Sequence, residues 1–184
     1  MRERKDFWDR NAGLYDRFMR KDGAAYEMMY EMIQPVVQHK TVLELATGTG
    51  LIAKHIVNAA AHIEATDASV EMIAEAKRDN CSVKLHFSVQ DMFRLPYADK
   101  SFDVVIVSNA LHIVPQPEKA LAEIKRVLTD DGILIAPTFT HAGNPFFGKV
   151  KAFFMKLAGF PLHSKWTSEE YLSFLRQNGW TVRK

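Results

Sequence analysis

Three acidic side chains, each at or just beyond the end of an expected β-strand, are the residues of this chain best suited to bind a ligand. They are Glu44, Asp67 and Asp91, the last of which follows Gln90. Glu44 leads into a tight turn that contains Gly48 and Gly50, and a helical pattern over 51–57 follows. Such a strand–loop–helix unit lets bare backbone approach a nucleoside-bearing ligand, although a purely structural connection could use glycine too.

Two kinds of nucleoside ligand compete for this loop. The spacing Gly48-x-Gly50-x-x-Ala53 satisfies the pattern that binds a dinucleotide pyrophosphate. Glu44, however, places a negative charge just before the loop, which is unfavourable for an anion but suits an ammonium or sulfonium group. Gln90-Asp91 could hydrogen-bond an adenine amino group, and the sequence has no Tyr-x-x-x-Lys pair for hydride transfer. These features favour a positively charged nucleoside.

Strand and helix patterns alternate around these acids. Strands are expected over 41–44, 62–67, 83–87, 102–107 and 133–138, and helices over 51–57, 69–78 and 117–128, with a break at Asp131-Gly132. This order predicts an α/β fold with a doubly wound, mostly parallel sheet and helices on both faces.

Helices are also expected at both ends of the chain. Residues 7–34 read as helical, and an aromatic helix should begin at Asn144-Pro145. A capping box at Thr167–Glu170 opens one more helix, Gly179 stops it, and Trp180–Val182 should begin a last strand. The sheet would then be incomplete, with its final strands either cut off or absent. The side chains expected to be buried in the first helical region are Phe7, Trp8, Leu14, Tyr15, Phe18, Met28, Met29 and Met32.

Composition indicates an ordinary globular protein. With 184 residues, 47% of them hydrophobic, a single domain over 1–184 is expected, divided into a helical cap (1–38), a cofactor-binding core (39–140) and an acceptor-side region (141–184). The single cysteine, the absence of a His/Cys cluster and a charged N-terminus without an apolar core predict a cytoplasmic protein without a metal.

Five segments in order resemble the class I S-adenosylmethionine-dependent methyltransferases, in particular the small stand-alone group related to the ubiquinone/menaquinone enzymes. They read FWDRNAGLYDRFM, VLELATGTG, EATDASVEMI, SVQDMFRLPYADKSFDVVIVSNALHIV and ALAEIKRVLTDDGILIAPTF. The resemblance covers nearly the whole chain and implies a Rossmann-like methyltransferase fold. Two departures are visible: Ala46 replaces the usual first glycine of the loop, which narrows the turn, and the usual closing hairpin is missing.

The resemblance implies a role for each site residue. Glu44 would hold the methionine ammonium of S-adenosylmethionine, and Asp67 would accept from both ribose hydroxyls. Asp91, with Gln90 beside it, would accept from the adenine amino group. The remaining cofactor contacts would come from Tyr15, Ala46, Thr47, Gly48, Gly50, Ala68, Met72, Met92, Ser108 and Asn109.

Each of these roles has a purely structural counterpart. Asp67 could only cap a helix, Asp91 could only start the turn before Leu95-Pro96, and Tyr15 and Met72 could be packing residues. On the acceptor side, His112 and His141 follow the fourth and fifth strands and are candidates to orient or deprotonate the acceptor, or else to pack.

The expected function is methyl transfer to a small-molecule acceptor by in-line displacement, with S-adenosylhomocysteine as the second product. The aromatic helix after Asn144, the N-terminal helix and Trp166 could form an apolar lid over that acceptor. The lysines and phenylalanines of that helix also permit weak membrane-surface contact, as in a phospholipid amine N-methyltransferase. An NAD(P)-dependent oxidoreductase and a non-catalytic cofactor-binding protein are the two competing functions. No nucleic-acid partner is expected, and the oligomeric state stays open.

Overall fold

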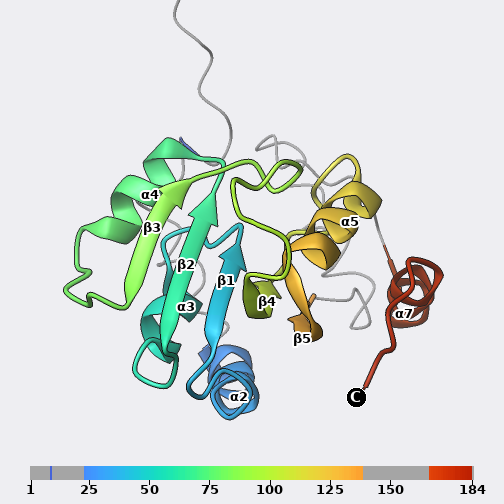
Figure 1. Cartoon of the computed structure of the whole chain (residues 1–184), viewed down its shortest axis with the longest axis horizontal. Coiled ribbons are helices and arrows are strands. Elements are labelled where there is room, and N and C mark those ends of the chain that lie inside the picture. The colour runs from blue at the N-terminus through green and yellow to red at the C-terminus, as the bar shows by residue number, and fades with distance from the viewer. Residues whose placement is uncertain (1–8, 10–22, 139–165, 184) are drawn as a thin grey trace, which may run out of the picture.

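The computed structural model describes residues 9, 23–138 and 166–183, and its centre is a five-stranded parallel sheet. The strands are β1 (Thr41–Leu45), β2 (His62–Asp67), β3 (Leu85–Val89), β4 (Phe102–Val107) and β5 (Leu128–Ile135). They lie side by side in the order β3-β2-β1-β4-β5, and every neighbouring pair is parallel. The arrows of β1, β2 and β3 point the same way in Figure 1. This is the doubly wound α/β fold that the alternating pattern predicts.

Helices cover both faces of the sheet, as Figure 1 shows. On one face α2 (Gly23–Ile33), α3 (Leu51–Ile56) and α4 (Val70–Lys77) enclose a core that includes Val42, Ala65 and Ile106 of the strands. On the other face α5 (Pro117–Val127) and α7 (Ser168–Gln177) pack against Leu43 and Val105, among others. Strands buried on both faces explain the almost continuous apolar run of β4.

The side on which the chain adds successive strands changes between β1 and β4. From β1 the chain adds β2 and β3 on one side, and it then crosses back to add β4 and β5 on the other. Leu45 at the end of β1 pairs with both Thr66 and Val107, so the carboxyl ends of β1, β2 and β4 meet at one edge. Ligands of open α/β sheets bind at such a switch point.

Local sequence signals correctly predict two helix starts. The Ser69 hydroxyl accepts from the Met72 N–H and caps α4, and Thr167 and Glu170 form the expected capping box of α7. Gly179, with φ of 80°, ends α7 as predicted.

The expectations for β5 and for the last strand were wrong. β5 begins at Leu128, five residues before the expected start, and α5 accordingly ends at Val127. Asp131-Gly132 lies inside this strand, because a register shift opposite Phe102–Val104 accommodates it. Residues 180–182 form no strand. The Trp180 N–H bonds back to the Leu175 carbonyl and closes α7, so this segment is used as a helix terminus.

Two smaller expectations also need correction. β3 starts at Leu85 rather than at Val83, which is 99% exposed. Met28 and Met32 are 65% and 67% exposed, not buried, because α2 turns Tyr26, Tyr30 and Ile33 towards the sheet instead. Met29 is partly buried, as expected.

The ends of the expected cap and lid fall partly outside the described residues. The predicted helix after Asn144 is one such part, whereas Trp166 is described and stacks on Phe174 of α7, with ring centroids 4.6 Å apart. In the described parts of the chain, no helix combines the length and apolarity needed to cross a membrane.

Candidate cofactor site

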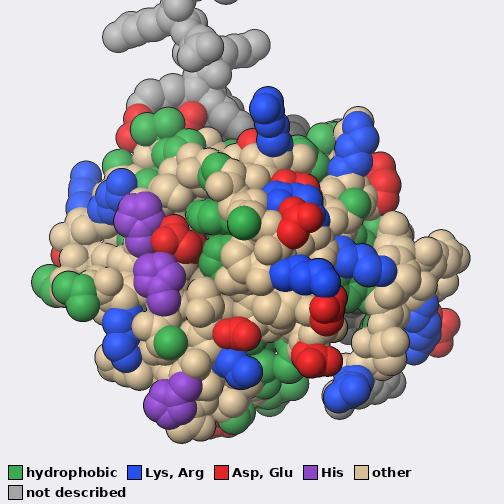
Figure 2. Space-filling view, in the orientation of Figure 1, with side chains coloured by type: hydrophobic (Ala, Val, Ile, Leu, Met, Phe, Trp, Pro, Cys, Tyr) green, Lys and Arg blue, Asp and Glu red, His purple; other side chains and the backbone are tan. Residues whose placement is uncertain are grey.

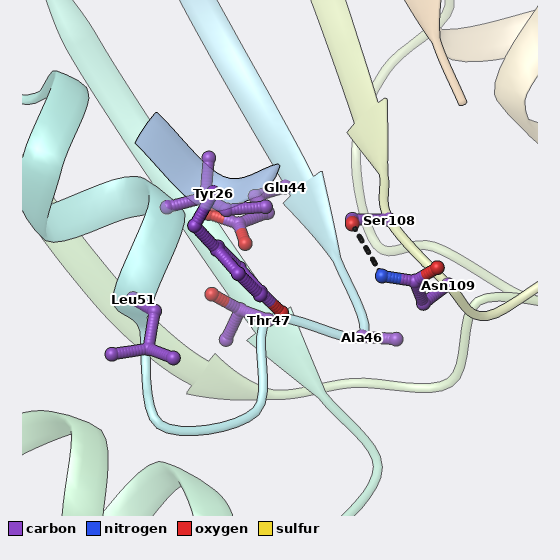
Figure 3. A pocket seen from close by; sticks show the side chains of 8 residues that line it. Tyr26, Glu44, Ala46, Thr47, Leu51, Ser108 and Asn109 are labelled. Carbon is purple, nitrogen blue, oxygen red and sulfur yellow. Dashed lines mark hydrogen bonds between the residues drawn. The ribbon is translucent and has the colours of Figure 1, made fainter. Parts of the chain in front are cut away.

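A crevice opens at the switch point, between the carboxyl ends of β1 and β4 (Figure 3). The space between the lining residues measures about 290 Å³ with the open solvent at its mouth included, so the crevice is shallow and open rather than an enclosed cavity. Its walls come from α2, the end of β1, the following loop, α3 and the end of β4. The lining residues are Tyr26, Glu44, Ala46, Thr47, Leu51, Ile52, Ser108 and Asn109.

The loop after β1 has the conformation that its glycines suggested. Gly48 and Gly50 have φ of 57° and 80°, and Ala46 has φ of 51°. A Cβ at Gly50 would lie 2.6 Å from the buried Phe87 ring, so glycine is required there for space as well as for conformation. Ala46, at the position of the usual first glycine, also takes a left-handed conformation, which costs an alanine some backbone strain.

Hydrogen bonds tie this loop to the end of β2. The Thr47 N–H donates to the Thr66 carbonyl, and the Gly48 N–H donates to Asp67 Oδ2, both at 2.9 Å. The Thr66 hydroxyl donates to the Glu44 carbonyl at 3.2 Å. The loop is therefore held in place by the neighbouring strand before any ligand binds.

Glu44 is a buried carboxylic acid with unmet bonding capacity. It is 2% exposed, and none of the described residues donates a hydrogen bond to its Oε2. The Thr47 hydroxyl beside it is also buried without a partner among the described residues. Burial raises the pKa of Glu44 to about 8; Thr47 and the Ala53 backbone act in the opposite direction, and the nearby Asp67 charge adds to the rise. A buried acid of this kind suits a ligand that brings a cation.

Asp67 at the end of β2 organises the second part of the site. Its Oδ1 accepts from the Ser69 N–H, and its Oδ2 from the Gly48 N–H, each at 2.9 Å. Burial raises its pKa, the backbone N–H groups of Ser69, Gly48 and Ala68 oppose the rise, and Asp9 adds to it. Each carboxylate oxygen has a further lone pair, so Asp67 can hold the loop and still accept from two ribose hydroxyls.

The other expected nucleoside contacts differ in accessibility. Ala68 is exposed and Met92 half-buried, whereas the Met72 side chain is only 1% exposed and packs inside the protein. Asp91 is exposed, and its Oδ1 accepts a hydrogen bond from the Phe93 N–H at 2.9 Å. Asp91 therefore does start the turn before Leu95-Pro96, which is the structural role considered for it above. Gln90 lies next to the Asp67 backbone, since its N–H donates to the Asp67 carbonyl.

The end of β4 supplies the opposite wall of the crevice. Ser108 and Asn109 line it together, and the Asn109 amide donates to the Ser108 hydroxyl at 3.2 Å (Figure 3). Three residues further on, His112 Nδ1 lies 3.2 Å from the hydroxyl of Thr138, which follows β5. His112 is therefore held between the ends of two strands, but it does not line the crevice itself.

Sequence reasoning overlooked three residues of the crevice. Tyr26, Leu51 and Ile52 line it without having been predicted. The spacing of Tyr26, Tyr30 and Ile33 on one helical stripe was the signal that could have found Tyr26. Tyr15 and His141 lie outside the described residues.

Fold and site together define an α/β protein that binds a nucleoside with a positively charged substituent. A model of the methyltransferase domain family matches residues 43–136, just over half of the chain. A demethylmenaquinone methyltransferase from Thermotoga maritima is 32% identical over 157 residues, which cover 81% of this chain and 67% of that protein. One from Renibacterium salmoninarum is 38% identical over 112 residues, covering 61% of this chain and 45% of that protein.

Solved structures agree on the fold. A chain from the complex of the Haloferax volcanii Trm112 methyltransferase activator with a methyltransferase has a TM-score of 0.82 at 22% identity, covering 99% of this chain and 80% of that one. A SAM-dependent methyltransferase from Thermotoga maritima has a TM-score of 0.76 at 22% identity, covering 96% and 81%.

The chain belongs to the methyltransferase domain family. This confirms the resemblance, the Rossmann-like fold and S-adenosylmethionine as the cofactor, in place of a dinucleotide. The site fits that cofactor, because the buried Glu44 oxygen and Thr47 hydroxyl present acceptors to a cation and the loop exposes backbone beside Asp67. The chain spans about half the length of several of the curated relatives that it matches.

Proposed function

We propose that this chain transfers a methyl group from S-adenosylmethionine to a small acceptor of the quinone class. The observation that carries the proposal is the pair of acids near neighbouring strand ends. Glu44 has a buried oxygen that receives no hydrogen bond from the described residues, and Asp67 holds the glycine loop. The acceptor class rests on relatives named as demethylmenaquinone methyltransferases and as a ubiquinone/menaquinone biosynthesis C-methyltransferase, the latter from Bdellovibrio bacteriovorus. Those names favour a quinone over a phospholipid amine.

The residues of the crevice bind and align, and they leave the activated chemistry to the cofactor. Bound S-adenosylmethionine supplies a methyl group on a sulfonium centre, ready for in-line displacement. In our proposal Glu44 holds the methionine ammonium, and Asp67 holds the ribose while it keeps Gly48 in place. Ser108 and Asn109, which directly follow β4, form the wall of the crevice beside the methionine end of the cofactor. Alignment of acceptor and methyl group is then the main catalytic contribution of the protein.

The adenine end is proposed to lie over Ala68 and Met92, near Gln90 and Asp91. Asp91 Oδ1 is engaged in its turn, so the contact to the adenine amino group would use its other oxygen. Met72 would support this region from inside, because its own side chain is buried.

His112 is the proposed acceptor-side residue of the described chain. Its ring is held by the Thr138 hydroxyl at the edge where β4 and β5 end. An imidazole at this position can orient the acceptor or serve as the general base for an acceptor that must lose a proton. His141 remains a second prediction for the same role.

Ligand binding and turnover test the proposal in sequence. Calorimetry should show binding of S-adenosylmethionine and S-adenosylhomocysteine but not of NAD or NADP. Methyl-labelled cofactor should then label a short-chain demethylmenaquinone in its reduced form, assayed beside phosphatidylethanolamine vesicles and RNA. Binding of NAD without binding of S-adenosylmethionine or S-adenosylhomocysteine would overturn the proposed methyl transfer. Cofactor binding with label appearing only in the phospholipid would replace the proposed acceptor class.

A further inference from the structure

The carboxyl group of Glu44 has no cationic neighbour in the lining of the crevice. Its side chain is 2% exposed, and Figure 3 shows it between Tyr26 and Thr47. The other described lining residues include no lysine, arginine or histidine, and Tyr26 is their one titratable side chain. The crevice therefore offers this acid no positive charge of its own.

The charged side chains of the adjacent helices are directed elsewhere. On α3, the Lys54 ammonium lies 5.9 Å from the centroid of the Phe87 ring, and the His55 ring stacks on Tyr30 with centroids 3.8 Å apart. The charged side chains of α2 are both exposed acids, namely Glu27 and Glu31. Neither helix thus places a described cation against Glu44.

The strands that flank β1 contribute acids and one histidine. Asp103 of β4 accepts from the Thr41 N–H at 2.9 Å, at the start of β1. Glu64 of β2 is hydrogen-bonded to His62 and to His86 of β3. Asp67, at the end of β2, is the acid whose negative charge opposes ionisation of Glu44. No described residue supplies the counter-charge that a buried carboxylate needs.

The neutral acid is therefore the favoured form of Glu44 in the free protein. Burial raises its pKa to about 8, in agreement with these surroundings. The cofactor brings what the crevice lacks, because its methionine portion carries an α-ammonium group. Free α-amino groups have a pKa of about 7.7–8.0, so this ligand group is already cationic in slightly acidic solution.

We propose that Glu44 is a neutral carboxylic acid in the free protein and releases its proton to solvent when the ammonium group of the cofactor binds beside it. This inference rests on the proposed function, since it concerns the same site. The O–H bond of the acid breaks, its electron pair stays on the carboxylate, and the proton passes to water at the open mouth of the crevice. Cofactor binding is thereby coupled to pH.

Calorimetry on the full chain counts the released proton. S-adenosylmethionine and S-adenosylhomocysteine, which both carry the ammonium group, are titrated at about pH 6.5 in buffers of different ionisation enthalpy. The slope of the observed enthalpy against the buffer enthalpy should show release of about one proton per ligand bound. 5′-Methylthioadenosine, which lacks the amino-acid portion, should release almost none on the same protein.

The dissociation constants should show the same coupling. Between about pH 6 and pH 7.5 that of S-adenosylhomocysteine should fall about tenfold, whereas that of 5′-methylthioadenosine should change about twofold or less. Glu44→Gln should bind S-adenosylhomocysteine more weakly, with little pH dependence and without proton release. Glu64→Gln changes an acid of the neighbouring strand that does not line the crevice, and it should release the proton as the wild type does.

The two hypotheses fail differently. If the wild-type protein binds neither S-adenosylmethionine nor S-adenosylhomocysteine, the proposed function itself is wrong. If it binds both without releasing a proton, Glu44 is already ionised and only the coupling is lost. Equal proton release by Glu44→Gln, or on binding of 5′-methylthioadenosine, would assign the proton to another group. Should Glu44→Gln not fold or not bind, the comparison of the ligands on the wild-type protein decides by itself.

Discussion

Two glutamates on neighbouring strands differ in how many hydrogen-bond donors the described residues offer them. Glu44 lies one residue before the end of β1 and lines the crevice, buried and with one oxygen unpartnered among the described residues. Glu64 lies in the middle of β2 and accepts from His62 and His86 at 2.9 Å and from Tyr97 at 3.3 Å. Figure 2 shows histidine side chains beside an acidic one on this open face, over β2 and β3.

Their pKa values diverge accordingly. Burial raises the pKa of Glu44 to about 8. Partial burial also acts to raise the pKa of Glu64, but hydrogen bonds from His86 and His62 outweigh it and hold that pKa below the usual value. The comparison teaches that an acid whose partners are supplied by the protein is structural, whereas an acid buried without enough partners marks the place where a ligand must bring them.

The largest expected effect is on cofactor affinity. Glu44→Gln removes the carboxyl group that can ionise when a cation binds beside it. It should weaken S-adenosylmethionine binding by about a hundredfold, because the bound cation then has no counter-charge in a desolvated site. Isothermal titration calorimetry measures this directly. Glu64→Gln is the matched control and should leave the affinity unchanged; similar losses in both variants would break the distinction between the two acids.

The second effect is a pH dependence of opposite sign for the two acids. Because the pKa of Glu44 is raised from 4.5 to about 8, the folded protein binds more protons than the unfolded chain between these values. The free energy of unfolding should therefore fall as the pH rises from about 4.5 to about 8, by on the order of 3 kcal/mol from this group.

Chemical denaturation across that pH range should show a flatter profile for Glu44→Gln. Glu64 has a lowered pKa, so its contribution is present above the unfolded pKa and is lost as the pH falls through the folded one. Glu64→Gln should flatten only the acidic limb of the profile, so that its stability is lower at neutral pH by less than about 1 kcal/mol and equal to that of the wild type in strong acid, because its histidine partners are solvent-exposed. A changed slope between neutral pH and about pH 8 in Glu64→Gln would contradict the contrast.

A third prediction concerns the loop that presents Glu44 to the crevice. Gly50→Ala forces a side chain into a left-handed residue and against the Phe87 ring, so it should destabilise the protein by about 2 kcal/mol. Gly23→Ala, where a Cβ would meet nothing within 4 Å, is the control and should be nearly neutral. Denaturant titration separates them; equal effects would mean that the loop is not constrained as described.

The smallest effect is expected from restoring the usual glycine. Ala46→Gly relieves a left-handed alanine with φ of 51° and should stabilise the fold by about 1 kcal/mol or less, since the added freedom of the unfolded chain offsets part of the gain. A thermal melt of the two proteins detects a shift of this size. A destabilised variant would show that the Ala46 methyl makes contacts worth more than the strain.

Much of the fold and half of the site could be inferred from local sequence. Alternating apolar patterns and glycines located β1, β2, β4 and the loop, because these depend on periodicity and on backbone preferences of nearby residues. Asp131-Gly132 was predicted to break the chain, but pairing with β4 keeps it inside β5. Trp180 was predicted to begin a strand, but its backbone N–H donates to a carbonyl of α7 instead. Such outcomes depend on partners that no local pattern contains.

By itself the sequence determined the order of strands and helices, the left-handed glycine loop, and the two acids, Glu44 and Asp67, that stand at neighbouring strand ends. Only the tertiary structure decided that α2 turns Tyr26 into the crevice and that Glu64 accepts hydrogen bonds from His86 and Tyr97. It also decided that no described residue donates a hydrogen bond to the buried Glu44 Oε2. The physical reason is that burial and hydrogen-bond partners come from residues far along the chain. Residue types are written locally, but the charge and pKa of an acid are set by whatever the fold packs around it.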